Sequence, residues 1–255
     1  MNKKSTLCII MLIFFSVLLA GCMEDSAHSN CVVIKGKGTY IKIQDAIDAA
    51  SEGDTIYVYV VTYYESIILN KSIHLIGDGI GKTIIDYHKN DSGNIIEINK
   101  DQCTIEGFTI TNSMKKFNST WFIKGIQIRS SNNSISDNSI SNTSYGIHIL
   151  SNSINNVISK NMIFNNQNGI EIVQSSYNKL SSNNISLNSQ FGVVIFQKAE
   201  YNEVSGNTFS NNNEAVRLKD VQYNTIKQNV LINNTKDIVE CCGAKNNNIY
   251  ENSYE

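Results

Sequence analysis

The chain has 255 residues, of which 36 are Asn and 38 are Ile, with 15 Gly and no Pro. So much β-branched apolar surface excludes a solvated, disordered chain. A net charge of −2 lacks the basic excess of a dedicated nucleic-acid binder, so we expect no nucleic-acid partner. The composition is typical of an all-β protein in which Asn occupies the turns.

The N-terminus has the features of an export signal. Lys3 and Lys4 precede an apolar run at residues 7–20, which is shorter than the roughly 20 residues that cross a bilayer. The run ends in Leu-Ala-Gly-Cys at residues 19–22, which resembles the lipobox of bacterial-type lipoproteins. The resemblance implies cleavage before Cys22 and a lipid on its thiol. We assign 1–21 to a lipoprotein signal peptide and 22–31 to the lipid anchor and tether; an ordinary signal with a chance Cys is the alternative.

Export permits disulfide bonds. Four cysteines remain outside the signal and the anchor, and two bridges among them are allowed, but the sequence does not fix their connectivity. For the adjacent residues Cys241 and Cys242 we expect a structural role. A strained vicinal disulfide ring and a soft-metal site are the alternatives. The four are Cys31, Cys103, Cys241 and Cys242.

The next element is a short helix. Apolar residues at 43, 46, 47 and 50 have helical spacing and predict an amphipathic helix over residues 41–50.

The second half of the chain repeats with a period of about 23 residues. A Gly-Ile-x-Ile motif begins at Gly125, Gly146 and Gly169 and recurs, weakened, at Gly192 and Ala215, which gives spacings of 21, 23, 23 and 23. A second motif, Asn-x-apolar-x-x-Asn, follows each strand motif and occurs six times. The alternation within each copy has period two, so the elements are strands.

A unit this short cannot bury its own apolar face, so its copies must stack, which predicts a parallel β-solenoid with a rise of about 4.8 Å per coil. We expect one domain over 32–255, the helix as its N-terminal cap and an insertion within 113–124. We also expect the closing asparagines to be structural. The predicted inward ladder is Ile126, Ile147, Ile170, Val193, Val216 and Ile238, and the predicted Asn ladder is Asn138, Asn161, Asn183, Asn207, Asn229 and Asn252.

The stretches at 43–50, 53–58 and 63–67 resemble the opening of right-handed parallel β-helix proteins. The repeats are similar to the pectin-lyase-like superfamily, especially the carbohydrate-binding and sugar-hydrolase class that includes NosD-like proteins. The resemblance covers nearly all of 32–255 and implies an all-β, right-handed, single-stranded parallel β-helix. It is carried by residues that build coils, so it specifies the fold better than the chemistry.

Superfamily members that cleave polysaccharides work from the outside of one sheet. The outward positions here include Glu97 and Glu171, which are three coils or about 14 Å apart, too far for the two carboxylates of glycoside hydrolysis. No acid cluster of the kind that the superfamily's lyases use accompanies Arg217. We therefore favour a non-catalytic protein. The outward ladder is Glu97, Gln127, His148, Glu171, Val194, Arg217 and Val239.

One part of this face suggests ligand contact. His148 and Glu171 should be neighbours on adjacent coils, and Leu150, Val173 and Phe196 should form an apolar stripe beside them. The alternative is an ordinary cross-strand pair with the stripe beneath a loop. The candidate ligand-binding residues are His148, Glu171, Phe196 and Arg217.

The NosD resemblance implies copper, which favours imidazole, thiolate and thioether ligands. The four histidines of the mature chain are not paired at ligand spacing, so we assign no metal site and no cofactor. We predict an exported lipoprotein, anchored to the outer face of the cytoplasmic membrane or the cell surface, that binds envelope polysaccharide or a surface protein. The alternatives are a polysaccharide lyase or glycoside hydrolase, and NosD-like copper delivery.

Overall fold

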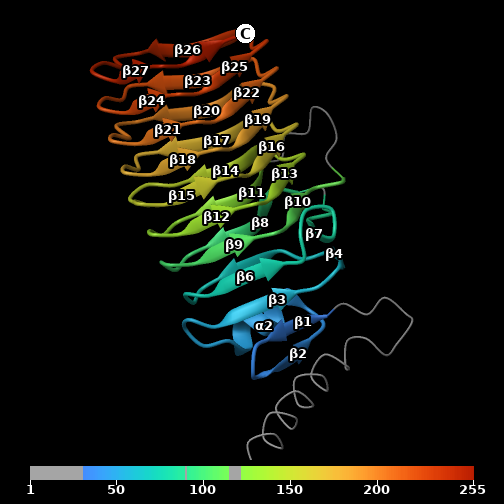
Figure 1. Cartoon of the computed structure of the whole chain (residues 1–255). Coiled ribbons are helices and arrows are strands. Elements are labelled where there is room, and N and C mark those ends of the chain that lie inside the picture. Colours follow the sequence, from blue (N-terminus) through green and yellow to red (C-terminus); the bar gives the residue numbers. More distant parts are fainter. Residues whose placement is uncertain (1–30, 90, 115–121) are drawn as a thin grey trace, which may run out of the picture.

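The computed structural model describes residues 31–89, 91–114 and 122–255 as three β-sheets wound around one apolar core (Figure 1). The predicted signal peptide, Cys22 and the tether up to residue 30 lie outside the described residues. So do residues 115–121 of the predicted insertion. Within the described residues, no helix is both long and apolar enough to cross a lipid bilayer.

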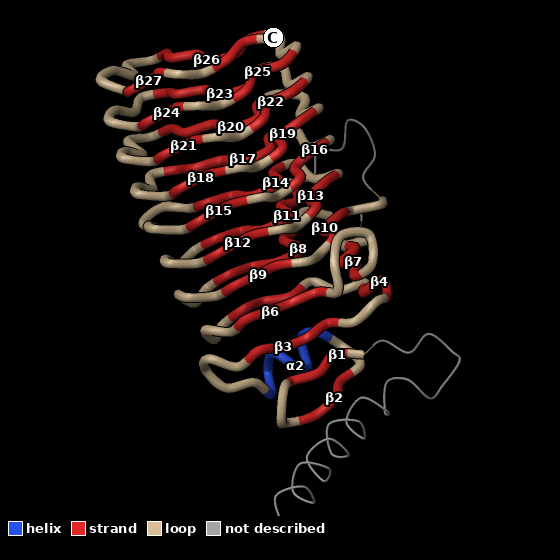
Figure 2. Tube along the Cα trace, viewed as in Figure 1, coloured by secondary structure: helices blue, strands red, loops and turns tan. Residues whose placement is uncertain are grey.

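The strands form sheets of eleven, nine and eight members (Figure 2). In spatial order, the eleven-stranded sheet contains β2 (Gly38–Tyr40), β1 (Val32–Ile34), β3 (Thr55–Val58), β6 (His74–Gly77), β9 (Thr104–Glu106), β12 (Ser134–Ser136), β15 (Val157–Ser159), β18 (Lys179–Ser181), β21 (Glu203–Ser205), β24 (Thr225–Lys227) and β27 (Asn248–Tyr250). The nine-stranded sheet contains β28 (Ser253–Tyr254), β25 (Val230–Ile232), β22 (Thr208–Ser210), β19 (Asn184–Ser186), β16 (Met162–Phe164), β13 (Ser139–Ser141), β10 (Thr109–Thr111), β7 (Thr83–Asp86) and β4 (Val61–Tyr63). The eight-stranded sheet contains β26 (Lys236–Cys241), β23 (Glu214–Lys219), β20 (Phe191–Phe196), β17 (Asn168–Val173), β14 (Tyr145–Ile149), β11 (Ile123–Ile128), β8 (Gly93–Ile98) and β5 (Ile67–Leu69).

Each coil stacks on the next with parallel pairing, and only β1 runs antiparallel, to β2 and β3. The register confirms the predicted inward ladder, which runs without a break from Ile126 to Ile238. Strand β11 begins at Ile123, so the last two residues of the predicted 113–124 insertion belong to the coil itself. The repeat motif does not include these two residues, which is why the sequence placed them in the insertion.

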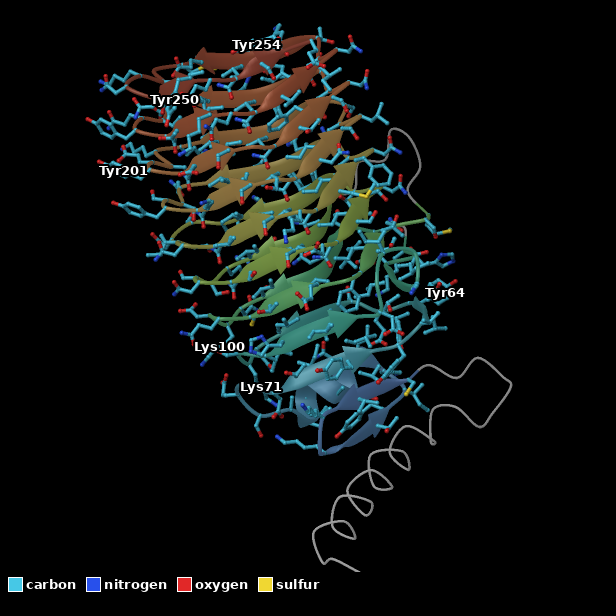
Figure 3. All side chains as sticks on the ribbon, in the orientation of Figure 1. Tyr64, Lys71, Lys100, Tyr201, Tyr250 and Tyr254 are labelled. Carbon is cyan, nitrogen blue, oxygen red and sulfur yellow. The ribbon has the colours of Figure 1, made fainter. Side chains whose placement is uncertain are left out.

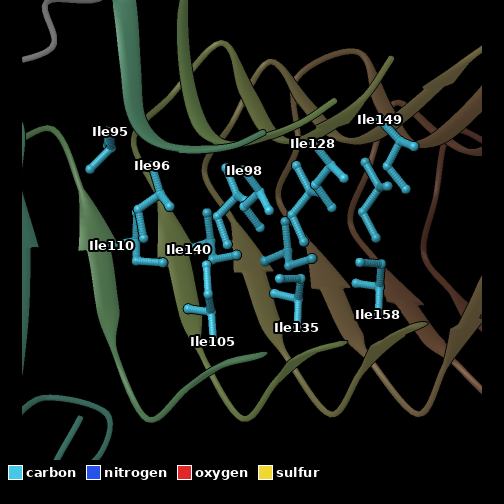
Figure 4. Close-up of a cluster of buried hydrophobic side chains, with 14 of the residues drawn as sticks. Ile95, Ile96, Ile98, Ile105, Ile110, Ile128, Ile135, Ile140, Ile149 and Ile158 are labelled. Carbon is cyan, nitrogen blue, oxygen red and sulfur yellow. The ribbon is translucent and has the colours of Figure 1, made fainter. Parts of the chain in front are cut away.

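The core consists mainly of Ile, Val and Leu side chains, and those in Figure 4 stack in rows along the solenoid axis, with each row supplied by one sheet. Stacking identical β-branched side chains at the coil spacing fills the interior without changing rotamers from coil to coil. The rows in Figure 4 are completely buried and include Ile98, Ile128 and Ile149 from one sheet and Ile105, Ile135 and Ile158 from another.

The predicted Asn ladder is structural, and all of its members are buried except Asn252, which is half-buried. The Asn183 side-chain amide donates to the Ile158 carbonyl and to Asn207 Oδ1, both at 2.9 Å, and its Oδ1 accepts from the Asn161 backbone at 3.0 Å. Two further Asn rows repeat this arrangement, for example at Asn156 and at Asn188. The corners therefore satisfy their own buried polar groups from coil to coil.

Helix α2 (Ile43–Ala49) confirms the predicted helix and packs against the first strands of the solenoid (Figure 1). Its first N–H groups donate to the Glu65 carboxylate at 3.0 and 3.2 Å. At its other end the Lys71 ammonium donates to three backbone carbonyls of residues 47–50. Side chains of opposite sign thus satisfy both ends of the helix that covers the N-terminal end of the solenoid.

Candidate functional site

The predicted outward ladder lies on the outer face of the eight-stranded sheet in the expected register, and His148 pairs directly with Glu171. The face is less open than the sequence suggested. Gln127, Glu171 and Val194 are only 3%, 9% and 4% exposed. Other side chains on the same face therefore cover them.

The covering side chains come from a second outward column that strict alternation does not predict. In these strands two successive residues, such as Gly146 and Ile147, are both buried, so the residue before the glycine faces outward again. A side chain cannot replace the glycine, because a Cβ at Gly146 would lie 2.5 Å from the carbonyl oxygen of Gly169 on the next coil. The doublet of small and apolar residues is the sequence signal for this column, whose members are Asn94, Lys124, Tyr145, Asn168, Phe191 and Glu214.

His148 and Glu171 form the centre of the site. Their Nε2 and Oε1 atoms are 3.3 Å apart, and their side chains are 12% and 11% exposed. The Asn168 amide donates to Glu171 Oε2 at 3.0 Å. The Tyr145 ring stacks on the imidazole with 5.0 Å between centroids, and Phe122 stacks on Tyr145. Both groups of the pair are thus fixed from the side and shielded from water.

This burial disfavours charge on both members of the pair. Burial, with smaller effects of Lys124 and Arg129, lowers the pKa of His148 to about 4. Burial raises the pKa of Glu171 to about 7, although the Asn168 hydrogen bond opposes the shift. Between these pH values a protonated Glu171 can donate to an unprotonated His148 Nε2. The pair therefore adds no charge to the face over this range.

Two buried polar atoms of the site have no hydrogen-bond partner in the described structure, namely His148 Nδ1 and Asn168 Oδ1. An unsatisfied buried polar atom costs about 1–3 kcal/mol. Apolar side chains would fill this face at lower cost, so the polar pair calls for an explanation other than packing.

Two cations flank the pair. Arg129 Nε lies 3.2 Å from Glu97 Oε1, and a Gln127 amide turned with its oxygen toward the guanidinium accepts from Arg129 at 2.7 and 2.9 Å. Lys124 is half-buried and has no carboxylate within ion-pair distance in the described part of the chain. Burial, and secondly Arg129, lower the pKa of Lys124. We call Lys124, Arg129, His148, Asn168 and Glu171 the polar cluster.

The other two predicted site residues lie elsewhere on the face. Phe196 is half-buried and lies on the coil after that of Glu171. There it pairs with Val173, which belongs to the same strand as Glu171. Arg217 belongs to a separate group, because its Nε and Nη2 donate to the Glu214 carboxylate at 2.5 and 2.6 Å. The sequence analysis correctly predicted that His148 and Glu171 are neighbours. It did not predict Asn168 or Lys124 as site residues, because it assigned Lys124 to the insertion.

The polar cluster offers one carboxyl group for proton exchange near neutral pH. Glycoside hydrolysis needs a second one within about 5–9.5 Å. Glu97 is three coils from Glu171, about 14 Å at the strand spacing, and is paired with Arg129. The arrangement therefore suits ligand binding, or chemistry that uses a single acid–base group.

Metal binding can be examined from the side chains in the described part of the chain. The described residues contain no group of three or more His, Cys, Asp or Glu side chains that could hold a metal ion. Cys241 and Cys242 are free thiols with Sγ atoms 3.1 Å apart, so the vicinal ring is not formed. Cys103 is also a free thiol and is buried, whereas Cys31 is disulfide-bonded. Because three of the four are free thiols, neither of the two bridges that these four cysteines would allow among themselves is present.

Comparison with known proteins places this geometry in a family. The family model described as periplasmic copper-binding protein (NosD) matches residues 44–255. A probable pectinesterase/pectinesterase inhibitor of Arabidopsis thaliana is 43% identical over 80 residues, which are 30% of this chain and only 16% of that protein.

Solved structures show the same fold at low identity. A rice weevil pectin methyl esterase has a TM-score of 0.65 at 13% identity, over 86% of this chain and 87% of that chain. A phiAB6 tailspike, in complex with oligosaccharides of Acinetobacter baumannii surface polysaccharide, has a TM-score of 0.62 at 12% identity, over 81% of this chain and 44% of its own. The predicted right-handed parallel β-helix is thereby confirmed. The chain belongs to the NosD family of pectin-lyase-like parallel β-helix proteins.

Proposed function

We propose that the protein binds an acidic polysaccharide, without cleaving it, through the polar cluster on the outer face of the eight-stranded sheet. The observation that carries the proposal is the half-buried Lys124 ammonium, which has no ion-pair partner among the described residues. It lies on a face whose central His–Glu pair is uncharged between about pH 4 and about pH 7. A sugar carboxylate is the partner that such a cation lacks.

The shape of the face supports a polymeric ligand. Strands of nearly constant length stack from β8 to β26, so the face extends along the solenoid axis (Figure 1). Phe122, which is 53% exposed, and the half-buried Phe196 offer apolar surface to the C–H faces of sugar rings. Two structural relatives support the same ligand class, because one is a pectin methyl esterase and the other is in complex with a surface polysaccharide fragment.

The proposal includes the location of the protein. We infer that it is exported and held at the membrane by a lipid on Cys22. The basic start, the apolar run and the Leu-Ala-Gly-Cys sequence support this inference, and the periplasmic description of the family agrees with export. An envelope polysaccharide would then be within reach of the anchored domain.

Affinity electrophoresis tests the proposal. Native gels would contain polygalacturonate, alginate or neutral hydroxyethylcellulose, and the wild type would be compared with Lys124→Gln. Lys219→Gln is the matched control, because it removes the same charge from an exposed position on the same sheet. We expect retardation in the acidic gels without loss of polymer, and a large loss of retardation only for Lys124→Gln.

Two results would contradict the proposal. Equal retardation of wild type and Lys124→Gln would remove the polar cluster as the site. Free migration of the wild type through every gel would exclude these polysaccharides as ligands and turn attention to a surface protein.

A second candidate function is β-elimination on a uronate chain. Once ionised, the Glu171 carboxylate, whose pKa is raised to about 7, could take the proton from the carbon next to the sugar carboxylate while Lys124 holds that sugar carboxylate. The electron pair of that C–H bond would form a C=C bond to the next ring carbon as the glycosidic C–O bond of that carbon breaks. The leaving oxygen would take up a proton from water or from the newly protonated Glu171. Loss of polymer with new ultraviolet absorbance, abolished by Glu171→Gln while retardation persists, would establish this function instead of simple binding.

A further inference from the structure

Three tyrosine rings stack at the corner that joins the eight-stranded sheet to the eleven-stranded sheet. The centroids of Tyr177 and Tyr201 are 5.2 Å apart with planes 6° from parallel, and those of Tyr201 and Tyr223 are 5.3 Å apart at 13°. The three residues are 56%, 47% and 42% exposed. Figure 3 shows Tyr201 pointing away from the body at one edge of the solenoid. We call this row the tyrosine ladder.

The backbone at these positions is one that bulky residues rarely adopt. Tyr177, Tyr201 and Tyr223 have φ of 61°, 57° and 61°, in the left-handed region. The same corner position in the coils on either side is held by Asn155 and Asn246, at φ of 57° and 56°. Asn suits this conformation because its short polar side chain can hydrogen-bond locally, whereas Tyr has no such compensation.

The fold alone therefore does not account for the tyrosines. Ring stacking returns some stability, but the corner is already built with Asn in the adjacent coils, without strain from a bulky side chain and without exposed aromatic surface. Left-handed backbone also occurs at other corners of this solenoid, for example at Lys160, Leu187 and Gln228, so the conformation alone does not mark a site. The feature that distinguishes this corner is three aromatic side chains that lie in register and are all exposed, and this row indicates a surface available for contact.

We propose that the tyrosine ladder is a second polysaccharide-binding surface, which contacts successive sugar rings of a chain that runs along the solenoid axis. Its repeat of 5.2–5.3 Å is about the length of one pyranose residue in an extended chain, so each coil can meet one ring. Because the rings stack face to face, each coil would offer the edge of its ring and a phenol hydroxyl, which can contact the sugar and hydrogen-bond to one of its hydroxyls.

The polar groups around the ladder fit a sugar ligand. The residue before Tyr201 is Glu200, whose carboxylate accepts from the Gln222 amide at 2.9 Å, just before Tyr223. Beyond the ladder, Glu203 pairs with lysines of the coils on either side. The surface is therefore a narrow aromatic row bordered by hydrogen-bonding groups, which can meet the hydroxyl groups of a sugar chain.

The inference rests on the proposed function for the class of ligand, but its physical basis differs. The polar cluster would attract a sugar carboxylate through charge, which salt screens, whereas contacts and neutral hydrogen bonds at the tyrosine edges are not weakened by that screening. At about 1 M NaCl, where the Debye length is roughly 3 Å, the ladder should supply most of the remaining affinity. This difference separates the two surfaces experimentally.

The test is surface plasmon resonance of the full chain on immobilised mannuronate-rich alginate, an extended and diequatorially linked acidic chain, at low salt and at about 1 M NaCl. Tyr177, Tyr201 and Tyr223 are replaced together by Asn, the residue that the adjacent coils use; Tyr201→Asn alone serves if the triple variant does not fold. Tyr64→Asn is the control, since Tyr64 is 65% exposed but lies on the opposite side of the solenoid (Figure 3).

We expect wild type and Tyr64→Asn to retain binding at high salt and the ladder variants to lose it by roughly tenfold or more. Ladder variants that bind like the wild type at both salt concentrations would overturn this inference alone. A wild type that does not bind at either concentration would overturn the proposed function, and this inference with it.

Discussion

The uncharged His148–Glu171 pair predicts an unusual dependence of stability on pH. Replacing Glu171 with Gln keeps the shape and the neutral character of the protonated carboxyl, including an oxygen that can accept from Asn168. The variant differs from the wild type only in that its side chain cannot ionise. Comparing the two at the same pH cancels every other titrating group.

The sign follows from the direction of the shift. Because the folded-state pKa of Glu171 is raised from 4.5 to about 7, the unfolded chain ionises first, and the wild type loses stability between these two pH values. At 1.36 kcal/mol per pH unit, the loss is roughly 3 kcal/mol. The Gln variant does not suffer this loss. Its free energy of unfolding relative to wild type should therefore rise by about 3 kcal/mol from pH 4.5 to pH 7.

The assay is equilibrium urea unfolding of both proteins, followed by circular dichroism, over this pH range. His148 should show the opposite pH dependence, because burial lowers its pKa to about 4. The free energy of unfolding of His148→Gln relative to wild type should therefore rise as the pH falls from 6.5 toward 4. A conventional ion pair would give the opposite slopes. A relative stability of Glu171→Gln that is constant or falls with rising pH would refute the neutral pair.

Three further predictions concern the coil. Asn183→Ala should destabilise the protein by at least about 3 kcal/mol in urea unfolding because several buried partners lose their bonds, whereas the exposed neighbour substitution Asn184→Ala should change little. Gly146→Ala should lower the melting temperature, because its Cβ would meet a carbonyl oxygen at 2.5 Å; an unchanged melting temperature would contradict the close coil packing. In alkylation of the native protein read by mass spectrometry, Cys242 should react and buried Cys103 should not until the protein is unfolded; equal rates would be inconsistent with the described burial.

The architecture was predictable because every coil places apolar residues and asparagines at the same positions of the repeat. One apolar ladder and one Asn ladder, read from a constant spacing, are enough to fix the register of a parallel solenoid, since a slip by one residue would expose the whole ladder. The pairing of Ile126 with Ile147 and of His148 with Glu171 follows from that spacing alone.

The burial of the candidate site was not predictable by the same rule. Alternation of period two places Glu171 outward, and it does point outward, but alternation fails at Gly169 and Ile170, which are both buried. Asn168 thereby joins the outer face and contacts Glu171. In the same way, Gly146 and Ile147 are both buried, so Tyr145 lies on the outer face and stacks on His148.

The tyrosine ladder was missed for a different reason. Turn statistics assign left-handed corners to Asn and Gly, so Tyr177, Tyr201 and Tyr223 read as ordinary loop residues in sequence. Only the alignment of each tyrosine with Asn155 and Asn246 reveals that they occupy one structural position. That position is defined by the fold and not by residue type.

A crystal structure with a bound oligogalacturonate would test the central claim most directly, because that claim concerns where an acidic sugar binds. The account predicts a sugar carboxylate within hydrogen-bonding distance of Lys124 Nζ, on the face that carries His148 and Glu171. An oligosaccharide bound only elsewhere, or an outer face of the eight-stranded sheet that stays empty at saturating ligand, would contradict it.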